Sequence, residues 1–495
     1  YVLGRLASYA ALGGIDAAVA VLRDALHQGA RILVVGDYDA DGATSSALVV
    51  RCLRAFGAAE VDFLVPNRFA YGYGLTPELV AVAAGQSPDV LITVDNGIAS
   101  VAGAAAARER GMRVVITDHH LPGESLPAAD AIVNPNLPGD GFPSKHLAGV
   151  GVAFYVMAAL RARLREESWF AARGLAEPTL AEHLDLVALG TVADVVPLDH
   201  NNRVLVAQGL ARMRAGRCRP GIRALAQHAG RELATLTAAD LGFAIAPRLN
   251  AAGRLEDMAV GIECLVTDDP HRAFALAARL DDLNRERRTV EAGMQARAET
   301  ILGGLETDAR VLPLGVCLYD PSWHEGVIGI LASRVKERLH RPVVAFAPAA
   351  AAPGELRGSA RSVAGLHVRD AIAAVATRHP GLVGRYGGHA MAAGLSLPVE
   401  HWEPFREAFD AEVRQHLADA DLCATVWSDG PLAAADLCLE TAEHLRAAGP
   451  WGNGFPEPVF DGEFEVVQRR IVGERHLKLV LRCPGEEPLL DAIAF

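Results

Sequence analysis

Short apolar runs alternate with helix-like segments up to residue 136, and this pattern constrains the fold more than any other feature. The runs read RILVVG (31–36), VDFLVP (61–66), DVLITVD (89–95), MRVVITD (112–118) and DAIVNPN (130–136). Between them lie helix-like segments such as ATSSALVVRCLRAFG (43–57), which ends at a glycine as helices often do. Strands that alternate with helices at this spacing predict an α/β fold whose parallel sheet is covered on both faces.

Acidic residues and histidines follow three of these predicted strands, in the stretches GDYDADGAT (36–44), VDNG (94–97) and TDHH (117–120). Ligands bind outside the carboxyl ends of parallel strands, so we expect these side chains to converge at one edge of the sheet. They are Asp37, Asp39, Asp41, Asp95, Asp118, His119 and His120. One such turn could be a solvated loop, since Asp is common in turns. Three together would repel one another unless something positive lay among them.

A divalent metal is the natural compensation. Carboxylates with one or two histidines suit Mn²⁺ or Mg²⁺, and this many acids suggests two ions. Two ions can clamp a phosphoryl group and activate water, which points to phosphoester hydrolysis. Asp194, within the otherwise apolar GTVADVV, is expected to join them, although a helix cap or turn residue is the alternative for this one acid.

The rest of the chain suggests four regions. Residues 1–270 contain the parallel sheet and a helical extension, and residues 271–306 form one long connecting helix. Residues 307–420 are mixed α/β, and residues 421–495 end in a stretch of period-two alternation that predicts a hairpin near Gly473. The chain begins at Tyr1 and stops within a strand-like run, so we expect both ends to be truncated.

Composition narrows the class of protein. The net charge of −13 argues against nonspecific coating of a polyanion, although basic residues could still line one groove. Seven dispersed cysteines without CxxC spacing favour reduced thiols in a cytoplasmic protein and no zinc site. The longest apolar run, at 149–160, is too short to span a bilayer, and no signal peptide is visible.

The four stretches GDYDADGAT, VDNGI, TDHH and GTVADVVPL, in this order, closely resemble the DHH phosphoesterase superfamily. GGHAMAAGLSL (387–397) is similar to the glycine-rich motif of the associated DHHA1 domain. VPNRFAYGYGLTPE, PRLNAAGRLEDM, SWHEGVIGILASRVKER and RGSARSV further resemble the RecJ family, and the β-rich tail resembles the OB-type domain of that family. This resemblance implies a single-stranded-DNA-specific 5′→3′ exonuclease that releases 5′-mononucleotides and acts in DNA recombination and repair, including mismatch repair.

The resemblance also implies residue roles. The implied metal ligands are Asp39, Asp41, Asp95, His119 and Asp194, with Asp95 bridging two ions. Asp37, Asp118 and His120 would support catalysis, and His120 could protonate the leaving group or hold the phosphate. The implied substrate-binding residues are Arg68, Arg248, Asn250, Arg254, Ser359, Arg361 and His389. The implied partners are single-stranded DNA with a 5′ end, single-strand-binding protein and a RecQ-type helicase, and the protein would act as a monomer.

Several alternatives remain open from sequence. A small-molecule phosphoesterase of the same superfamily, such as a pyrophosphatase or a hydrolase of pAp and nano-RNA, is disfavoured by the arginine motifs and the β-rich tail. DADGAT also resembles the nucleophile loop of haloacid-dehalogenase phosphatases, a scheme in which TDHH and VDNG have no place. A non-catalytic replication scaffold is disfavoured because every expected acid is present. For RGSARSV, alternating arginines could mark a solvated strand face, and His389 could be a turn residue.

Overall fold

The computed structural model describes residues 1–66, 74–307, 312–418, 422, 425–473, 476–483 and 489–494. The chain divides into two compact units, Tyr1–Ala424 and Thr425–Phe495. Within the described residues no single helix is long and apolar enough to cross a membrane, although the bent pair Leu3–Ala11 and Ile15–Gln28 passes that test of length and composition.

A five-stranded parallel sheet forms the first part of the larger unit. Its order is β2 (Glu60–Leu64), β1 (Arg31–Val35), β3 (Val90–Val94), β4 (Arg113–Thr117) and β5 (Ala131–Val133). Every residue of β3 is buried, as expected for a central strand covered on both faces. The predicted α/β sheet is therefore confirmed, with all five predicted strands present.

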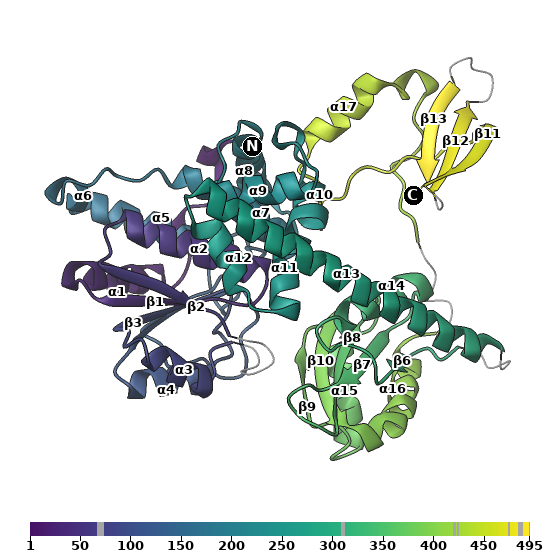
Figure 1. Cartoon of the computed structure of the whole chain (residues 1–495), viewed down its shortest axis with the longest axis horizontal. Coiled ribbons are helices and arrows are strands. Elements are labelled where there is room, and N and C mark those ends of the chain that lie inside the picture. The colour runs from purple at the N-terminus through teal and green to yellow at the C-terminus, as the bar shows by residue number, and fades with distance from the viewer. Residues whose placement is uncertain are drawn as a thin grey trace. The chain divides into compact units, whose positions relative to one another are not determined.

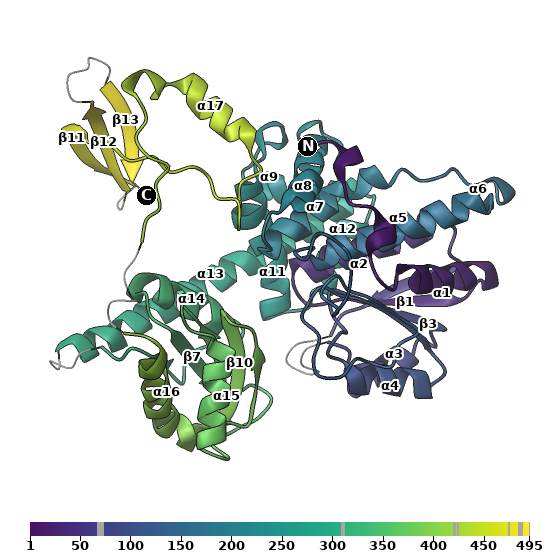
Figure 2. The same cartoon turned by 180° about the vertical axis from the view of Figure 1, so that it is seen from behind.

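Helices cover both faces of this sheet (Figures 1 and 2). α3 (Pro77–Ala84) and α4 (Val101–Glu109) pack on one face, where Leu33, Leu91 and Val114 contribute to their shared core. α1 (Ile15–Gln28), α2 (Ala40–Ala55) and α5 (Gly149–Glu166) lie on the other. Thr76 caps α3 by accepting the Leu79 N–H at 3.2 Å, with Pro77 in the first turn, as the sequence predicts.

A helical region follows and leads into one long helix. Its principal elements are α7 (Leu184–Ala193), α8 (His200–Arg214), α9 (Pro220–His228), the π-helical turn η5 (Leu241–Ile245), α11 (Ala246–Leu255) and α12 (Ala259–Val266). The predicted long helix is α13 (Pro270–Thr307). Its first half packs against α9, α11 and α12, and Met294, Ala298 and Leu302 in its second half join the core of the next sheet.

The second sheet is mixed. Its order is β6 (Val316–Tyr319), β7 (Val343–Pro348), β8 (Glu355–Arg361), β10 (Ala392–Pro398) and β9 (Arg385–Gly388), with only β6 and β7 parallel. α13 and α14 (Ile328–Leu339) cover one face, while α15 (Val368–Arg378) and α16 (Trp402–His416) cover the other. The runs LGVCLYD (314–320), PVVAFAP (342–348) and LRGSARSV (356–363) predict β6, β7 and β8. The runs GVIGILASRVKERL (326–339) and EPFREAFDAEVRQHL (403–417) predict α14 and α16, whereas α15, β9 and β10 are missed.

The smaller unit contains a three-stranded antiparallel sheet in its described part. β11 (Glu465–Val472) pairs with β12 (His476–Arg482), which also pairs with β13 (Leu489–Ala494). The predicted hairpin is thus confirmed, and Gly473 lies in its turn with a φ of 56°.

Candidate metal centre and phosphate pocket

The turn after β1 holds three acids by backbone hydrogen bonds. Asp39 is the N-cap of α2 and accepts the Gly42 N–H at 2.9 Å, while Asn250 of α11 accepts the Ala40 N–H at 2.7 Å. A Cβ at position 42 would lie 2.5 Å from the carbonyl oxygen of Asp37, so glycine is required for this tight turn. The local sequence DADG therefore fixes where these carboxylates point.

Asp41 is buried and faces the start of α5. Its two carboxylate oxygens accept the N–H groups of Gly149 at 2.6 Å and Val150 at 2.9 Å. Burial and the charge of Asp39 nevertheless raise the pKa of Asp41 to about 7, because the two hydrogen bonds offset only part of the desolvation. This carboxylate is thus oriented by the backbone while its charge lacks compensation.

Asp95 lies in the left-handed region, with a φ of 62°, directly after β3. This conformation costs a non-glycine residue roughly 1–2 kcal/mol. The fold sustains it through the hydrogen bond from the Asp95 N–H to the Thr117 carbonyl at 3.1 Å. Burial, followed by the charges of Asp41 and Asp39, raises the pKa of Asp95 well above its usual range. Strain and charge are concentrated at one buried carboxylate, which is typical of a functional site.

His119 connects the turn after β4 to the end of α7. Its Nε2 atom lies 3.1 Å from Asp95 Oδ1 and 3.5 Å from Asp194 Oδ2. Burial and the neighbouring His120 lower the pKa of His119 to about 4, so the ring is neutral at pH 7. Asp194 is the C-cap of α7, as its alternative reading as a cap residue expects, and its carboxylate also lies within 4.8 Å of ligand atoms of Asp41 and His119. Burial and the nearby acids raise the pKa of Asp194 well above its usual range.

His120 is paired with a buried carboxylate. Its Nδ1 atom lies 2.7 Å from Asp118 Oδ1, and Asp118 also accepts backbone N–H groups from Ile98, His119 and His120. Burial alone would lower the pKa of His120, but the hydrogen bond and charge of Asp118 outweigh it and raise the pKa to about 9. The His120 ring is therefore cationic at neutral pH, and the centre of the His389 ring lies 6.3 Å away.

Two asparagines hold the TDHH turn in place by hydrogen bonds. The sequence patterns did not identify them as site residues. The Nδ2 atom of Asn134 donates to the His120 carbonyl at 2.8 Å, and that of Asn136 donates to the His119 carbonyl at 2.6 Å. Both lie in NPN, directly after β5. The signal that could have found them was therefore the one used for the acids, namely polar residues at the carboxyl end of a parallel strand.

The donor set fits one or more divalent ions. Three groups of side chains each place their ligand atoms within 4.8 Å of one another. These groups are Asp37, Asp39 and Asp95; Asp41, His119 and Asp194; and Asp95, His119 and His120. Buried Asp95 Oδ1 and His119 Nε2 lie 3.1 Å apart but form no hydrogen bond with each other or with any other described group. Carboxylates and a neutral imidazole are ligands that Mn²⁺ and Mg²⁺ accept.

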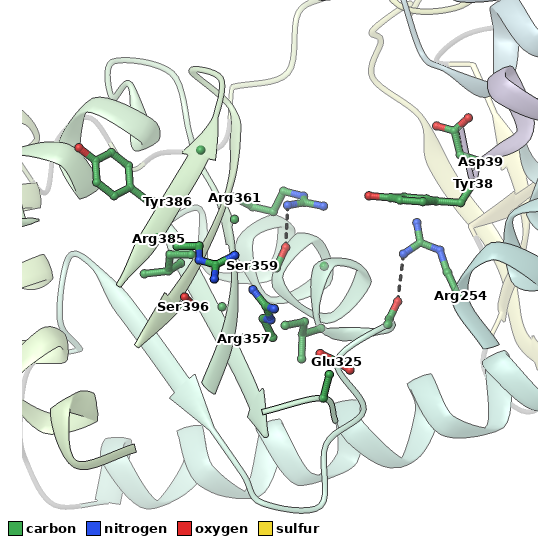
Figure 3. Close-up of a pocket in the computed structure, with 18 of the residues that line it drawn as sticks. Tyr38, Asp39, Arg254, Glu325, Arg357, Ser359, Arg361, Arg385, Tyr386 and Ser396 are labelled. Carbon is green, nitrogen blue, oxygen red and sulfur yellow. Dashed lines mark hydrogen bonds between the residues drawn. The ribbon is translucent and has the colours of Figure 1, made fainter. Parts of the chain in front are cut away.

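A cavity of about 540 Å³ opens beside this cluster and is lined by four arginines (Figure 3). Arg254 comes from α11, and Arg357, Arg361 and Arg385 come from the second sheet. Tyr38 and Asp39, from the turn between β1 and α2, line the same cavity. Arg361 Nη1 donates to Ser359 Oγ at 3.0 Å, and burial lowers the pKa of Arg361. A half-buried guanidinium of this kind is suited to an anionic ligand.

The predicted substrate residues divide into three groups. Asn250, Arg254, Ser359 and Arg361 line the cavity, and Arg254 links α11 to the loop before α14 by donating to the Gly326 carbonyl at 3.1 Å. Arg248 does not line the cavity, because it pairs with Asp281 at 2.8 Å and donates to backbone carbonyls.

The other two predicted substrate residues lie elsewhere. His389 follows β9 and faces His120, while Arg68 lies outside the described residues. Sequence reasoning missed the cavity residues Tyr38, Glu325, Arg385 and Tyr386.

The fold and the acid cluster define a DHH-type phosphoesterase. The DHH family N-terminal domain matches residues 31–191, the DHHA1 domain matches residues 311–415, and the RecJ OB domain matches residues 428–495.

Relatives make the assignment more specific. The single-stranded-DNA-specific exonuclease RecJ of Dickeya dadantii is 61% identical over 490 residues, covering 99% of this chain and 85% of that protein. The Escherichia coli RecJ is 56% identical over 484 residues, covering 98% of this chain and 84% of that protein. The crystal structure of RecJ from Thermus thermophilus with Mn²⁺ matches with a TM-score of 0.80 at 36% identity, covering 97% of this chain and 66% of that one. The chain belongs to the RecJ family.

Proposed function

We propose that this protein, a metal-dependent nuclease, hydrolyses single-stranded DNA from the 5′ end and releases 5′-mononucleotides. One observation carries the proposal. Asp39 of the metal-binding turn lines the same cavity as Ser359 and Arg361, so a phosphate held by the arginines would lie beside the acid cluster. The name of the relatives, single-stranded-DNA-specific exonuclease RecJ, supports the choice of substrate.

We propose two ions, Mn²⁺ or Mg²⁺, held by Asp39, Asp41, Asp95, His119 and Asp194, with Asp37 as a further neighbour. When bound, such ions supply a hydroxide-like nucleophile at neutral pH and positive charge for the phosphoryl oxygens. Two related RecJ structures contain Mn²⁺ and Mg²⁺, respectively. The N–H groups of Gly149 and Val150 donate to the Asp41 carboxylate and would hold it in place at the site.

The chain's own residues account for binding, direction and proton transfer in this proposal. Arg361 and Ser359, with Arg254 and Arg357, would hold the 5′-terminal phosphate. Cleavage would occur at the next phosphate, so the leaving atom is the 3′ oxygen of the terminal nucleotide. Cationic His120, held by Asp118, would give its Nε2 proton to that oxygen. The remaining strand again begins with a 5′-phosphate, which the arginine pocket can take up for another cycle.

A time course on single strands labelled at the 5′ or the 3′ end, with and without Mn²⁺, tests this proposal. We expect the 5′ label to appear as a mononucleotide in the earliest samples, and only with the metal. Early release of the 3′ label, or equally fast degradation of a blunt duplex, would contradict it. Hydrolysis of pyrophosphate or pAp without activity on strands would favour the small-molecule phosphoesterase.

The proposal also includes the cellular role and the boundaries implied by the family. We propose a cytoplasmic monomer that acts in recombination and in mismatch and recombinational repair, with single-strand-binding protein and a RecQ-type helicase as partners. We also propose functional divisions at residues 1–270, 271–306, 307–420 and 421–495. We also propose Arg68 and Arg248 as substrate-binding residues, because the family resemblance implies them. Arg248 would first have to be released from its ion pair with Asp281.

A further inference from the structure

Phe243 is the most exposed phenylalanine among the described residues, with 86% of its surface accessible. It lies on η5, whose neighbours Leu241, Ala244 and Ile245 are buried. Leaving such a side chain in water forgoes the stabilisation that its burial would give. π-helical turns are rare and are frequent at functional sites, so both the residue and its backbone single out this position.

The turn that carries Phe243 packs beside the metal centre. A Cβ at Gly242 would lie 3.3 Å from Cγ1 of Val192, near the end of α7, and Asp194 follows two residues later. On its other side η5 runs directly into α11, where Asn250 anchors the Ala40 N–H of the DADG turn. The turn that carries Phe243 is therefore connected to both acid-bearing turns, to one by packing against α7 and to the other through α11.

A second exposed apolar side chain directly follows Asp194. Val195 is 63% exposed and has a φ of 62°. The left-handed conformation is unusual for a β-branched residue and marks a strained position. Two exposed apolar side chains therefore lie on elements that pack against each other, Val195 just after α7 and Phe243 on η5.

We propose that Phe243, assisted by Val195, is a stacking platform for a base of the DNA strand beyond the scissile phosphate. The inference rests on the proposed exonuclease function. Base stacking on an aromatic ring is independent of sequence, as degradation of arbitrary strands requires. Phe243 and Arg254 lie toward opposite ends of the η5–α11 segment, roughly 16 Å apart at about 1.5 Å per residue. With the 5′-phosphate at Arg254, the surface at Phe243 suits the part of the strand that follows.

The test combines a protein variant with strands that lack one base. KM and kcat are measured for wild type, Phe243→Ala, Phe243→Trp and a control, Tyr9→Ala, on 5′-phosphorylated strands with one abasic site at successive positions. Stacking is worth roughly 1–3 kcal/mol, so Phe243→Ala should raise KM about tenfold on intact strands, while Phe243→Trp retains wild-type KM. At one abasic position the KM of wild type should rise by the same factor, whereas the KM of Phe243→Ala should rise no further.

Because Phe243 is exposed, its replacement should leave the melting temperature unchanged. If wild type is active and Phe243→Ala has the KM of wild type, this inference alone is overturned. The same holds if Phe243→Ala raises KM by an equal factor at every abasic position. A wild type that fails to degrade single strands from the 5′ end would instead overturn the proposed function. Tyr9, an aromatic residue of the N-terminal segment away from these turns, should behave as wild type.

Discussion

The acid cluster and the arginine pocket meet at Asp39, which belongs to both, and these two halves of the site are built in opposite ways. The acids sit on short turns after parallel strands and are oriented by backbone N–H groups, as with Asp41 and the start of α5. Three of the four arginines are long side chains of the mixed sheet and Arg254 comes from α11, while Arg361 donates to Ser359 and to a neighbouring carbonyl.

The difference teaches how each half meets its ligand. The acids are rigid and crowded, so their charge must be neutralised by ions that match a fixed geometry. The arginines form a wider surface suited to a phosphate in more than one orientation. Substitutions in the acid cluster should therefore abolish turnover, whereas those in the pocket should weaken and redirect binding.

The largest expected effect comes from Asp95→Asn. We expect at least about a 10³-fold loss of kcat, because this carboxylate belongs to two of the three ligand clusters. The metal-free variant should be as stable as wild type or more so, since the substitution removes a buried charge that burial and neighbouring acids disfavour. Exonuclease assays and thermal melts with and without Mn²⁺ check both expectations. The control is Asp62→Asn, which changes an exposed residue of β2.

A smaller effect is expected for Arg361→Ala. Loss of a charge-assisted contact to the terminal phosphate should reduce kcat/KM on 5′-phosphorylated strands by about 10–100-fold, and the preference over 5′-hydroxyl strands should shrink. Mn²⁺ binding should be unchanged. Equal losses on both kinds of strand would show that Arg361 does not read the 5′ end.

Asn136→Ala should have a still smaller effect. Asn136 donates to the carbonyl of His119, and loss of such an outer contact typically weakens a metal site about tenfold. We expect a higher Mn²⁺ concentration for half-maximal activity and near-normal kcat at saturating metal. A loss of kcat that excess Mn²⁺ does not restore would mean that this asparagine acts otherwise.

His183, which belongs to neither half, should produce the smallest effect, confined to stability. Burial and the charges of Arg219 and Arg51 lower the pKa of His183 to about 3, from an ordinary value of 6.5. The unfolded chain binds a proton below pH 6.5 and the folded chain does not, so its contribution to stability falls by about 1.4 kcal/mol per pH unit as pH drops below 6.5. Denaturant titrations at pH 7 and pH 5.5 measure this effect. Between these two pH values the free energy of unfolding should fall less for His183→Gln than for wild type.

The sheet and the acid cluster could be predicted from sequence because both follow local rules. Buried parallel strands read as apolar runs, and their carboxyl ends converge, which brought Asp37, Asp41, Asp95 and His119 together. The family resemblance, rather than any pattern, supplied Ser359 and Arg361.

What could not be predicted depends on distant packing. Arg248 shares α11 with Asn250 and Arg254, yet its ion pair with Asp281 of α13 removes it from the cavity that they line. β9 and β10 escaped because their glycines and small residues give little strand signal. The π-helical turn that exposes Phe243 has no local signature either, and in the fold it packs against α7, α9 and α11.

The most direct test of the account is the stoichiometry of Mn²⁺ binding measured by isothermal titration calorimetry at neutral pH. We predict about two ions per chain for wild type and for Asp62→Asn, and loss of at least one ion together with nuclease activity for Asp95→Asn. Wild-type binding and activity in Asp95→Asn, or no Mn²⁺ binding by wild type, would contradict the claim that the acids at the edge of the parallel sheet form the catalytic metal centre.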